Sequence, residues 1–343
     1  MSKTSIEART APLVRRAVSG PAMGARWSAV VFVGEGFDID ALARALAAEV
    51  EAVEEEASNW RPDSAVERLN RAPIGEWLTL PPGLVTVLEA ALTISDLSGG
   101  AFDIGVGDLV RAHGFGGGTR VPDAGGIAAL AGRPRFAALK ALQLDVTGCR
   151  ARRLAPLTID LAGIAKGHGV DRMAEVVRRF GIASFLVGID GEMRAGGRKP
   201  DGRPWAIGQE KPDRAARALA GMVELTEAAI ATSGDYRHVR EIAGRTVSHT
   251  MDPRTGAPLG GDLAQVTVVA PSAMAADAWA TALMVVGMEA GEALARRLGL
   301  STILVTRSGV TRANLAEAGE CPVEPARDRP ARPSPVAPGG SVL

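Results

Sequence analysis

The sequence predicts an α+β fold, and two observations support this class. Segments with helical periodicity are mixed with short apolar runs typical of strands, and the two kinds do not alternate in the regular order of a doubly wound parallel sheet. The chain has 343 residues, of which 46% are hydrophobic and 23% are charged. This length and composition allow a substantial hydrophobic core, and we find no short tandem repeat.

The first expected elements lie in the N-terminal third of the chain. Residues 26–33 are expected to form a strand after a turn at Met23-Gly24, and Asp40 is expected to cap the next helix. The apolar face of this helix consists of Leu42, Leu46, Val50 and Val53. Its acidic residues are expected to be mostly solvated, as a helix surface rather than a metal site: Glu49, Glu51, Glu54, Glu55 and Glu56.

A second helix is expected after Pro81-Pro82, and Gly99-Gly100 ends it. Residues 111–135 are rich in Gly, Arg and Pro, which predicts a loop. A third helix is expected from Lys166 to about Phe180, with Gly181 as its C-cap. The remaining expectations are strands at 184–189, 205–209, 228–233, 265–270 and 301–306, and helices at 273–286 and about 289–298.

Both chain ends are expected to lie outside the folded domain. We expect an N-terminal extension over residues 1–20, one domain over 21–315, and a tail over 316–343. The last 22 residues hold six prolines, and this composition predicts no packed structure. Residues 1–20 lack the apolar core of a signal peptide, and no stretch is long and apolar enough to span a membrane. A cytoplasmic location is therefore expected.

Charge and cysteine content exclude several classes of function. Lys plus Arg equals Asp plus Glu at 39 each, so no global field would attract nucleic acid or an anionic membrane. Cys149 and Cys321 lie far apart, and they give neither a disulfide framework nor a zinc-site spacing. Two such cysteines fit a reducing compartment.

Asp277 and Thr281 form the first group of residues with chemical potential. On a helix, positions i and i+4 share one face, so the carboxylate and the hydroxyl can converge on one point. Two such oxygens suit magnesium, a hard cation that takes few protein oxygens besides water and phosphate. In the alternative interpretation, Thr281 bonds to its own helix and Asp277 is solvated. Taken alone, the pair favours that alternative.

The run from Asp160 to Gly167 is the second group. Gly163 would let the backbone approach a ligand, and its carbonyl could serve as a hard ligand. Lys166, near a helix N-terminus, would add positive charge where phosphate oxygens bind. The spacing matches neither a Walker loop nor a GxGxxG fingerprint. The alternative is a tight loop with a surface lysine.

The segment from His249 to Gly256 is the third group. Its Asp-Pro and Thr-Gly pairs indicate turns, so its polar side chains are expected on a loop. A histidine there could take a proton from a hydroxyl nucleophile, because histidine pKa values lie near neutrality. A single loop histidine is more often plain surface, and we interpret His113, His168 and His238 in that way.

Three further segments place aromatic or small residues beside polar ones. Trp60, within residues 58–64, could stack on a flat heterocycle, and Phe102 lies in residues 100–103. Core packing is an equally good interpretation of either aromatic residue. Residues 231–236 join a strand end to a polar turn, which could be an ordinary turn or one wall of an active site.

The order of these segments resembles the ApbE family of FAD:protein FMN transferases, over about residues 20–310. The segments that carry the resemblance are Met23-Gly24, the stretch from Ser58 to Asn70, GAFDIGVGDL (100–109), DLAGIAKGHGVDR (160–172), ATSGDY (231–236), HTMDPRTG (249–256) and AADAWATAL (275–283). The resemblance implies mixed sheets with flanking helices, arranged as two interlocked halves.

The resemblance also implies roles for individual residues. Asp277 and Thr281 match the family's magnesium ligands, completed by backbone carbonyls at Gly163 and, as a further candidate, Ala280. His249 begins the HxxDPxTG block and is the candidate general base. Residues at the positions where the family contacts FAD are Met23, Trp60, Ala101, Phe102, Asp103, Asp160, Lys166 and Met251.

For the reaction, the resemblance implies magnesium-dependent transfer of the FMN moiety of FAD to a Thr or Ser hydroxyl in a motif of a partner flavoprotein, with release of AMP. Two alternatives stay open. With water as nucleophile, the same residues would make the protein an FAD pyrophosphatase. Without turnover, it would be a non-catalytic FAD-binding protein.

Two features depart from the family pattern. Gly105 stands where the family usually carries Thr, and Asp108 stands where Pro is common, so an altered pocket around Asp103 is expected. Residues 1–20 are also expected to carry no signal peptide, whereas many family members are exported. Two interpretations stay open: the target is cytoplasmic, or this start lies downstream of a true signal.

Overall fold

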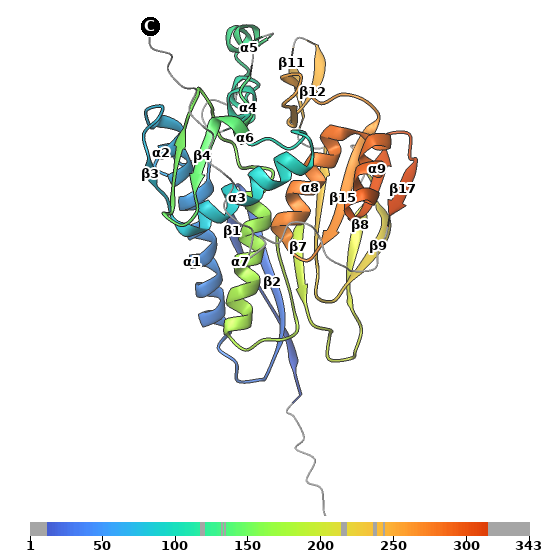
Figure 1. The fold of residues 1–343 in the computed structure, drawn as a ribbon. Coiled ribbons are helices and arrows are strands. Elements are labelled where there is room, and N and C mark those ends of the chain that lie inside the picture. The colour runs from blue at the N-terminus through green and yellow to red at the C-terminus, as the bar shows by residue number, and fades with distance from the viewer. Residues whose placement is uncertain are drawn as a thin grey trace, which may run out of the picture.

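The computed structural model describes residues 12–116, 121–131, 133, 135–213, 218–235, 239–242 and 244–314. Its main element is an eight-stranded sheet in which every neighbouring pair is antiparallel (Figure 1). In spatial order the strands are β1 (Val14–Ala22), β2 (Ala25–Val33), β6 (Phe185–Ile189), β7 (Glu192–Gly196), β10 (Ala229–Gly234), β15 (Leu263–Ala270), β16 (Ser301–Thr306) and β17 (Thr311–Asn314). Sheet and helices together confirm the α+β prediction.

Helices cover one face of this sheet, and a hairpin packs on the other. The helical layer contains α1 (Ile39–Ala57), α7 (Ala165–Arg179) and α8 (Ala273–Val286), with α9 (Met288–Leu298) against β16. The hairpin of β8 (Trp205–Glu210) and β9 (Leu219–Leu225) buries Trp205 and Leu225 against the opposite face. Strand residues therefore alternate between the two cores: Ala29 and Val31 face the helices, whereas Val30 and Phe32 face the hairpin.

Helix α8 lies at the centre of the molecule. Eleven of its 14 residues are buried, which fits a helix that packs on the sheet on one side and on α3 (Pro82–Leu97) on the other. Ser272 caps it by accepting the N–H of Ala275. Trp279 is fully buried in the core that α8 shares with α3. Any group on α8 is consequently held rigidly.

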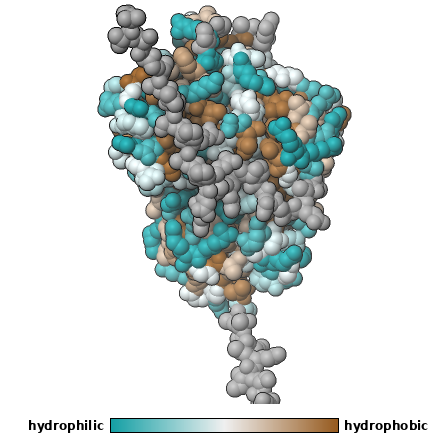
Figure 2. Space-filling model, in the orientation of Figure 1, coloured by the Kyte–Doolittle hydropathy of each residue, from teal (hydrophilic) through white to brown (hydrophobic). Residues whose placement is uncertain are grey.

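Smaller elements lie around this central body. They are α2 (Ala65–Arg71), α4 (Gly107–Ala112), α5 (Ala124–Leu130), α6 (Ala138–Ala141), the sheet of β3 (Leu78–Thr79), β5 (Arg150–Arg153) and β4 (Leu142–Asp145), and the pairs β11 (Val239–Ile242) with β12 (Arg245–Ser248) and β13 (Met251–Asp252) with β14 (Ala257–Pro258). In Figure 1, α4, α5, β11 and β12 all lie at the same end of the molecule. Figure 2 shows polar and apolar residues interspersed on one face.

Most of the longer predicted elements are confirmed, and the differences are local. Asp38, not Asp40, caps α1, because its side chain accepts the N–H of Ala41 at 2.9 Å. The sheet begins at Val14, inside the expected N-terminal extension, since β1 pairs with β2 along its whole length. The expected loop at 111–135 contains α5 and the end of α4. Cys321 and the Pro-rich tail lie outside the described residues.

The acidic residues of α1 are less solvated than expected. Glu51 and Glu55 are exposed, but Glu49 pairs with Arg172 of α7. Glu54 accepts the backbone N–H of Met23. Burial raises the pKa of Glu56, with Arg172 acting in the opposite direction. Within the described residues, no helix combines the length and the apolar character needed to cross a bilayer.

Candidate active site

A cavity of about 660 Å³ brings together residues that are far apart in the sequence. Twelve of the thirteen residues proposed above line it: Met23, Trp60, Ala101, Phe102, Asp103, Asp160, Gly163, Lys166, His249, Met251, Asp277 and Thr281. The thirteenth, Ala280, is fully buried in α8 and lies outside the lining. The structure thus places nearly the whole proposed set around one space.

Asp277 lies where α8 meets the N-terminus of α7. Its Oδ2 atom accepts the backbone N–H of Gly167 at 3.0 Å, so the carboxylate satisfies one of the free amides in the first turn of α7. Only 3% of the residue is exposed. Burial, together with the nearby Glu192, raises the pKa of Asp277 to about 7, although Lys166 and the Gly167 amide act in the opposite direction.

Lys166 is held beside Asp277 by an acid that the sequence analysis missed. Its Nζ donates to Glu192 Oε1 at 2.8 Å and lies 3.9 Å from Asp190 Oδ2. Burial lowers the pKa of Lys166, but the charges of Glu192 and Asp277 outweigh it, so the pKa ends above its ordinary value. The ammonium is therefore charged at neutral pH. The sequence feature that could have indicated this acid is its position directly after the Asp190-Gly191 turn, at the end of a predicted strand.

Thr281 and Gly163 meet beside Asp277. The Thr281 hydroxyl pairs with the Ser233 hydroxyl at 3.1 Å, so it faces β10 and the cavity. A Cβ atom added at Gly163 would lie 3.0 Å from Thr281 Oγ1. Glycine at this position therefore keeps space next to the hydroxyl. Ser233 also lines the cavity, and it belongs to the 231–236 segment, for which the sequence left open an ordinary turn or one wall of an active site.

The oxygens around this space fit a hard cation. A carboxylate and a hydroxyl of α8 and the glycine at position 163 line the same cavity, and oxygen ligands of this kind suit magnesium. Within the described ranges, no group of three or more His, Cys, Asp or Glu side chains is arranged to hold a metal. The candidate site thus differs from an acidic or thiolate cluster.

His249 lies on the loop after β12, at the wall of the cavity formed by α4 and its following residues. Its ring contacts the ring of Phe115 in an edge-to-face arrangement, with centroids 6.2 Å apart. The guanidinium of Arg240, on β11, lies 5.3 Å from the Phe115 centroid on its ring face. Phe115 therefore links the β11–β12 hairpin to the histidine.

The rest of the 249–256 segment shapes the loop. Asp252 accepts from both the backbone and the side chain of Arg254, and Arg254 also donates to the carbonyl of Val285 in α8 at 3.0 Å. Burial would raise the pKa of Asp252, but these bonds lower it below its usual value. The two residues thus fasten the loop to α8. Tyr236 and His238 lie outside the described residues.

Asp103 faces the cavity and is held by backbone amides. It accepts the N–H groups of Gly105 at 2.7 Å and Ala138 at 3.1 Å, and burial raises its pKa against these bonds. Arg135 donates to the Gly105 carbonyl at 2.8 Å and pairs with Asp108. The two departures from the family pattern are therefore joined by one arginine. A Cβ at position 105 would lie 2.5 Å from Leu157 Cδ1.

Trp60, Met23 and Met251 complete the walls. Trp60 is 51% exposed, as expected for a ring that could stack on a ligand rather than fill the core. Met23 has a left-handed backbone with φ of 47° in the turn between β1 and β2. Met251 is buried at 4% exposure. The other two histidines of the described residues, His113 and His168, are buried rather than surface residues.

Comparison with known proteins places this geometry in a family. The model of the ApbE family matches residues 23–304. A Vibrio cholerae protein named FAD:protein FMN transferase is 34% identical, with the match covering 85% of this chain and 87% of that protein. A Klebsiella pneumoniae protein of the same name is 32% identical, and the match covers 85% of this chain and 84% of that protein.

Solved structures agree with the sequence comparison. The chain is similar to "Flavin Transferase ApbE from Vibrio cholerae", with a TM-score of 0.78, 33% identity, and coverage of 88% of this chain and 97% of that chain. For the apo flavinyl transferase ApbE of Pseudomonas stutzeri, the TM-score is 0.77 and the identity is 37%, and the match covers 89% of this chain and 96% of that chain. The shared fold and the names of these relatives define an enzyme of the transferase class. The chain belongs to the ApbE family of FAD:protein FMN transferases.

Proposed function

We propose that this chain transfers the FMN moiety of FAD to a Thr or Ser hydroxyl of a target flavoprotein, that it releases AMP, and that it requires magnesium. The observation that carries the proposal is the convergence of Asp277, Thr281, Gly163 and Lys166 in a cavity that His249 also lines. The names of the relatives supply FAD and a protein acceptor. The Thr or Ser acceptor and the AMP leaving group follow from the family resemblance, and magnesium is inferred from the resemblance together with the oxygens of Asp277 and Thr281.

Asp277, Thr281 and the backbone carbonyl of Gly163 would hold the magnesium, with Ala280 as a further candidate carbonyl donor. When bound, magnesium supplies electrophilic stabilisation of phosphate oxygens. The buried Asp277 carboxylate favours such a partner, because a buried charge is costly unless a cation or hydrogen bonds compensate it. Ser233 would orient the Thr281 hydroxyl.

The side chains of this protein would do the remaining work. Lys166, kept protonated by Glu192, would stabilise negative charge that develops on the diphosphate during attack at phosphorus. His249 would take the proton of the acceptor hydroxyl. Trp60 and Phe102 would pack against the rings of FAD, and Met23, Ala101, Asp103, Asp160 and Met251 would form the rest of its pocket.

An Asp277 variant tests the metal assignment. We expect Asp277→Asn and Asp277→Ala to lower magnesium-dependent turnover of FAD by about a hundredfold or more, because the site has one carboxylate ligand. Turnover is measured as FMN attached to an acceptor peptide, by its mass gain, and as AMP released. The control is Asp145→Asn, which changes an aspartate of β4 that pairs with Arg150 and lies outside the cavity lining. Undiminished turnover in both Asp277 variants would remove the metal assignment.

The same assay separates transfer from the alternatives. The protein is incubated with FAD and magnesium, first alone and then with the acceptor peptide. Transfer gives a peptide adduct of one FMN, whereas a pyrophosphatase gives free FMN and AMP with no adduct. A binding protein leaves FAD intact under both conditions.

A further inference from the structure

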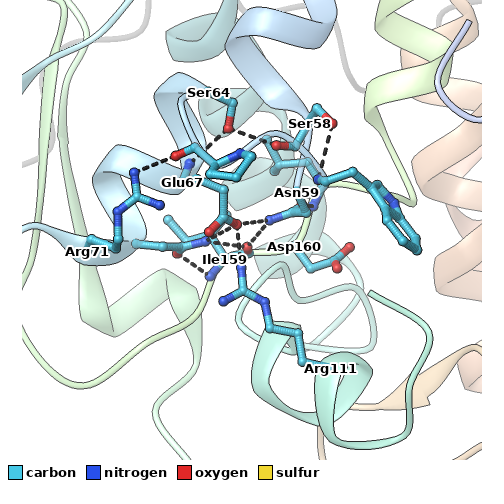
Figure 3. Close-up of polar contacts among 12 residues, drawn as sticks. Ser58, Asn59, Ser64, Glu67, Arg71, Arg111, Ile159 and Asp160 are labelled. Atoms are coloured by element: carbon cyan, nitrogen blue, oxygen red, sulfur yellow. Dashed lines mark hydrogen bonds and ion pairs between the residues drawn. The ribbon is translucent and has the colours of Figure 1, made fainter. Parts of the chain in front are cut away.

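A buried polar cluster lies directly behind one wall of the cavity. We call it the Glu67 cluster, and it consists of Asn59, Ser64, Glu67, Asn70 and Arg111 (Figure 3). Ser64 caps α2 by accepting the N–H of Glu67 at 3.2 Å and donates its own hydroxyl to the Ser58 carbonyl at 2.8 Å. Glu67 is 6% exposed, so its carboxylate depends on protein partners.

One carboxylate oxygen of Glu67 organises two side-chain amides and one cation. Glu67 Oε1 accepts from Asn59 Nδ2 at 2.9 Å and from Asn70 Nδ2 at 3.1 Å, and it pairs with Arg111. Both amides also donate to the Ile159 carbonyl, at 2.8 Å and 2.9 Å. Each amide nitrogen has two N–H groups, so both groups of each are used. The carboxylate thereby fixes which way the two amides point.

The oxygen ends of these amides hold the segment that carries Asp160. Asn59 Oδ1 accepts the N–H of Leu161 at 3.0 Å, and Asn70 Oδ1 accepts the N–H of Ile159 at 2.7 Å. The residue between them is Asp160, whose carboxylate points away from the cluster in Figure 3 and lines the cavity. If either side-chain amide rotated by half a turn, its NH₂ group would face the backbone N–H of Leu161 or Ile159, and that hydrogen bond would be lost.

The cluster joins three walls of the cavity that are distant in sequence. Asn59 precedes Trp60, the 159–161 segment carries Asp160, and Arg111 lies on α4 just before Phe115. Glu67 itself does not line the cavity, so it can act on a ligand only through its partners. Arg111 forms an ion pair with Glu67, and the charge of Arg111 also acts on the nearby Asp160 carboxylate.

We propose that Glu67 is a positioning residue for FAD: by orienting Asn59, Asn70 and Arg111, it fixes the walls that carry Trp60 and Asp160 and so determines FAD affinity. The inference rests on FAD being the ligand of the cavity, as in the proposed function. The hydrogen-bond and ion-pair partners of Lys166 are Glu192 and Asp190, and Asp277 accepts from the Gly167 amide, so these partners lie outside the Glu67 cluster. Glu67 is therefore expected to influence binding more than the chemical step.

The test is Glu67→Gln in the full chain. Glutamine keeps the size, but it removes the charge that pairs with Arg111 and brings an N–H₂ group into a site filled by donors. We expect the dissociation constant for FAD, measured by flavin fluorescence in EDTA, to rise about tenfold. The KM for FAD with magnesium should rise in parallel, while kcat changes less than about threefold. A purely structural role would lower thermal stability without this division between KM and kcat.

Two further variants keep the inference testable. Glu51→Gln is the matched control, because Glu51 is an exposed acid of α1 paired with Arg61, and its FAD affinity should equal that of the wild type. If Glu67→Gln does not fold, Arg111→Gln replaces only the more exposed partner and should weaken FAD binding about threefold. Affinity within measurement error of the wild type in the folded variant, or a kcat loss as large as the KM rise, overturns the proposal. A wild type that binds FAD without transferring FMN contradicts the proposed function but leaves the comparison of FAD dissociation constants valid.

Discussion

At the scale of single residues, the cavity is defined by charges that the fold forces together. Asp277 and Glu192 are both almost fully buried, and the positive charge of Lys166 interacts favourably with both carboxylates. Neither acid could be buried in this way without compensation. A lysine and backbone amides supply part of it, and the proposed cation supplies the rest. In the proposed function, the cation and Lys166 would supply the positive charge that phosphoryl transfer requires, and the acids would hold that positive charge in place.

His249 provides the first prediction at this scale. We expect His249→Ala to lower turnover of FAD by about a hundredfold or more, because the acceptor hydroxyl would lose its proposed base. The dissociation constant for FAD should change less than about threefold. Single-turnover rates and fluorescence titration measure the two quantities. An affinity loss equal to the rate loss would assign His249 to binding instead, and Arg254→Ala serves as a control for disturbance of the loop.

His168 gives a prediction about pH. Burial, with a contribution from Arg172, lowers the pKa of His168 from 6.5 to about 4, so the folded protein keeps this ring neutral. The unfolded chain binds the proton first, and the stabilisation is fully present above pH 6.5 and is lost as pH falls toward 4. The loss could reach about 3 kcal/mol. Urea unfolding of His168→Met between pH 7.5 and 4.5 should show a shallower decline than the wild type; equal slopes would contradict the prediction.

At the scale of elements, the junction of α7 and α8 sets the geometry of the proposed metal site. Asp277 of α8 accepts from the first turn of α7, and Lys166 belongs to that same turn. The helices approach closely at Gly167, where an added Cβ would lie 2.3 Å from the Ala273 carbonyl oxygen. The nearest atoms at this contact belong to the backbone of Ala273 and Met274, so no side chain could move aside to make room. Glycine is required there for packing.

Gly167→Ala tests this contact. Alanine is the better helix former by about 1 kcal/mol, but the clash with α8 should dominate and reduce the free energy of unfolding by about 2 kcal/mol. Turnover should fall as well, because Lys166 and Asp277 are displaced from each other. The matched control is Gly291→Ala in α9, where the nearest atom lies 3.4 Å from the new Cβ and stability should be kept or improved. Equal stability in the two variants, measured by urea unfolding, would contradict the packing argument.

At the scale of the whole molecule, one antiparallel sheet carries the cavity. Strands from the beginning, middle and end of the chain lie side by side, with β1 and β17 at its two edges. The last strand is held by pairing with β16 and by the Asn314 side chain, which donates to the Leu300 carbonyl at 2.9 Å. We therefore propose that the folded domain ends near residue 315.

Truncation tests this boundary. A chain that ends at residue 315 should keep the melting temperature and the FAD affinity of the full chain, because β17 is retained. A chain that ends at Gly309 loses β17 and its ion pair from Arg312 to Glu292, and it should melt several degrees lower. Differential scanning calorimetry of both chains is the measurement. A large loss of stability on removing residues 316–343 alone would show that the domain extends further.

Much of the fold could be predicted because its long elements have local signals. The apolar periodicity of α1 and α7 and the apolar runs of α8 and β15 depend only on neighbouring residues. Short elements such as α2 and β4 have too few residues for a period, and contacts with distant segments decide them. The edge strand β1, with its alternation of exposed and half-buried residues, lacks the apolar run that revealed its neighbours.

The sequence by itself determined the family and the types of chemical group at the site, because motif identity and order are properties of the chain. Only the tertiary structure decided that Glu192 holds Lys166, that Phe115 contacts His249, and that Glu67 stands behind Asp160. The members of these pairs are separated by 26 to 134 positions in the sequence, and no local pattern specifies them. The physical reason is that burial creates the low-dielectric surroundings in which such pairings form, and burial exists only once the chain has folded.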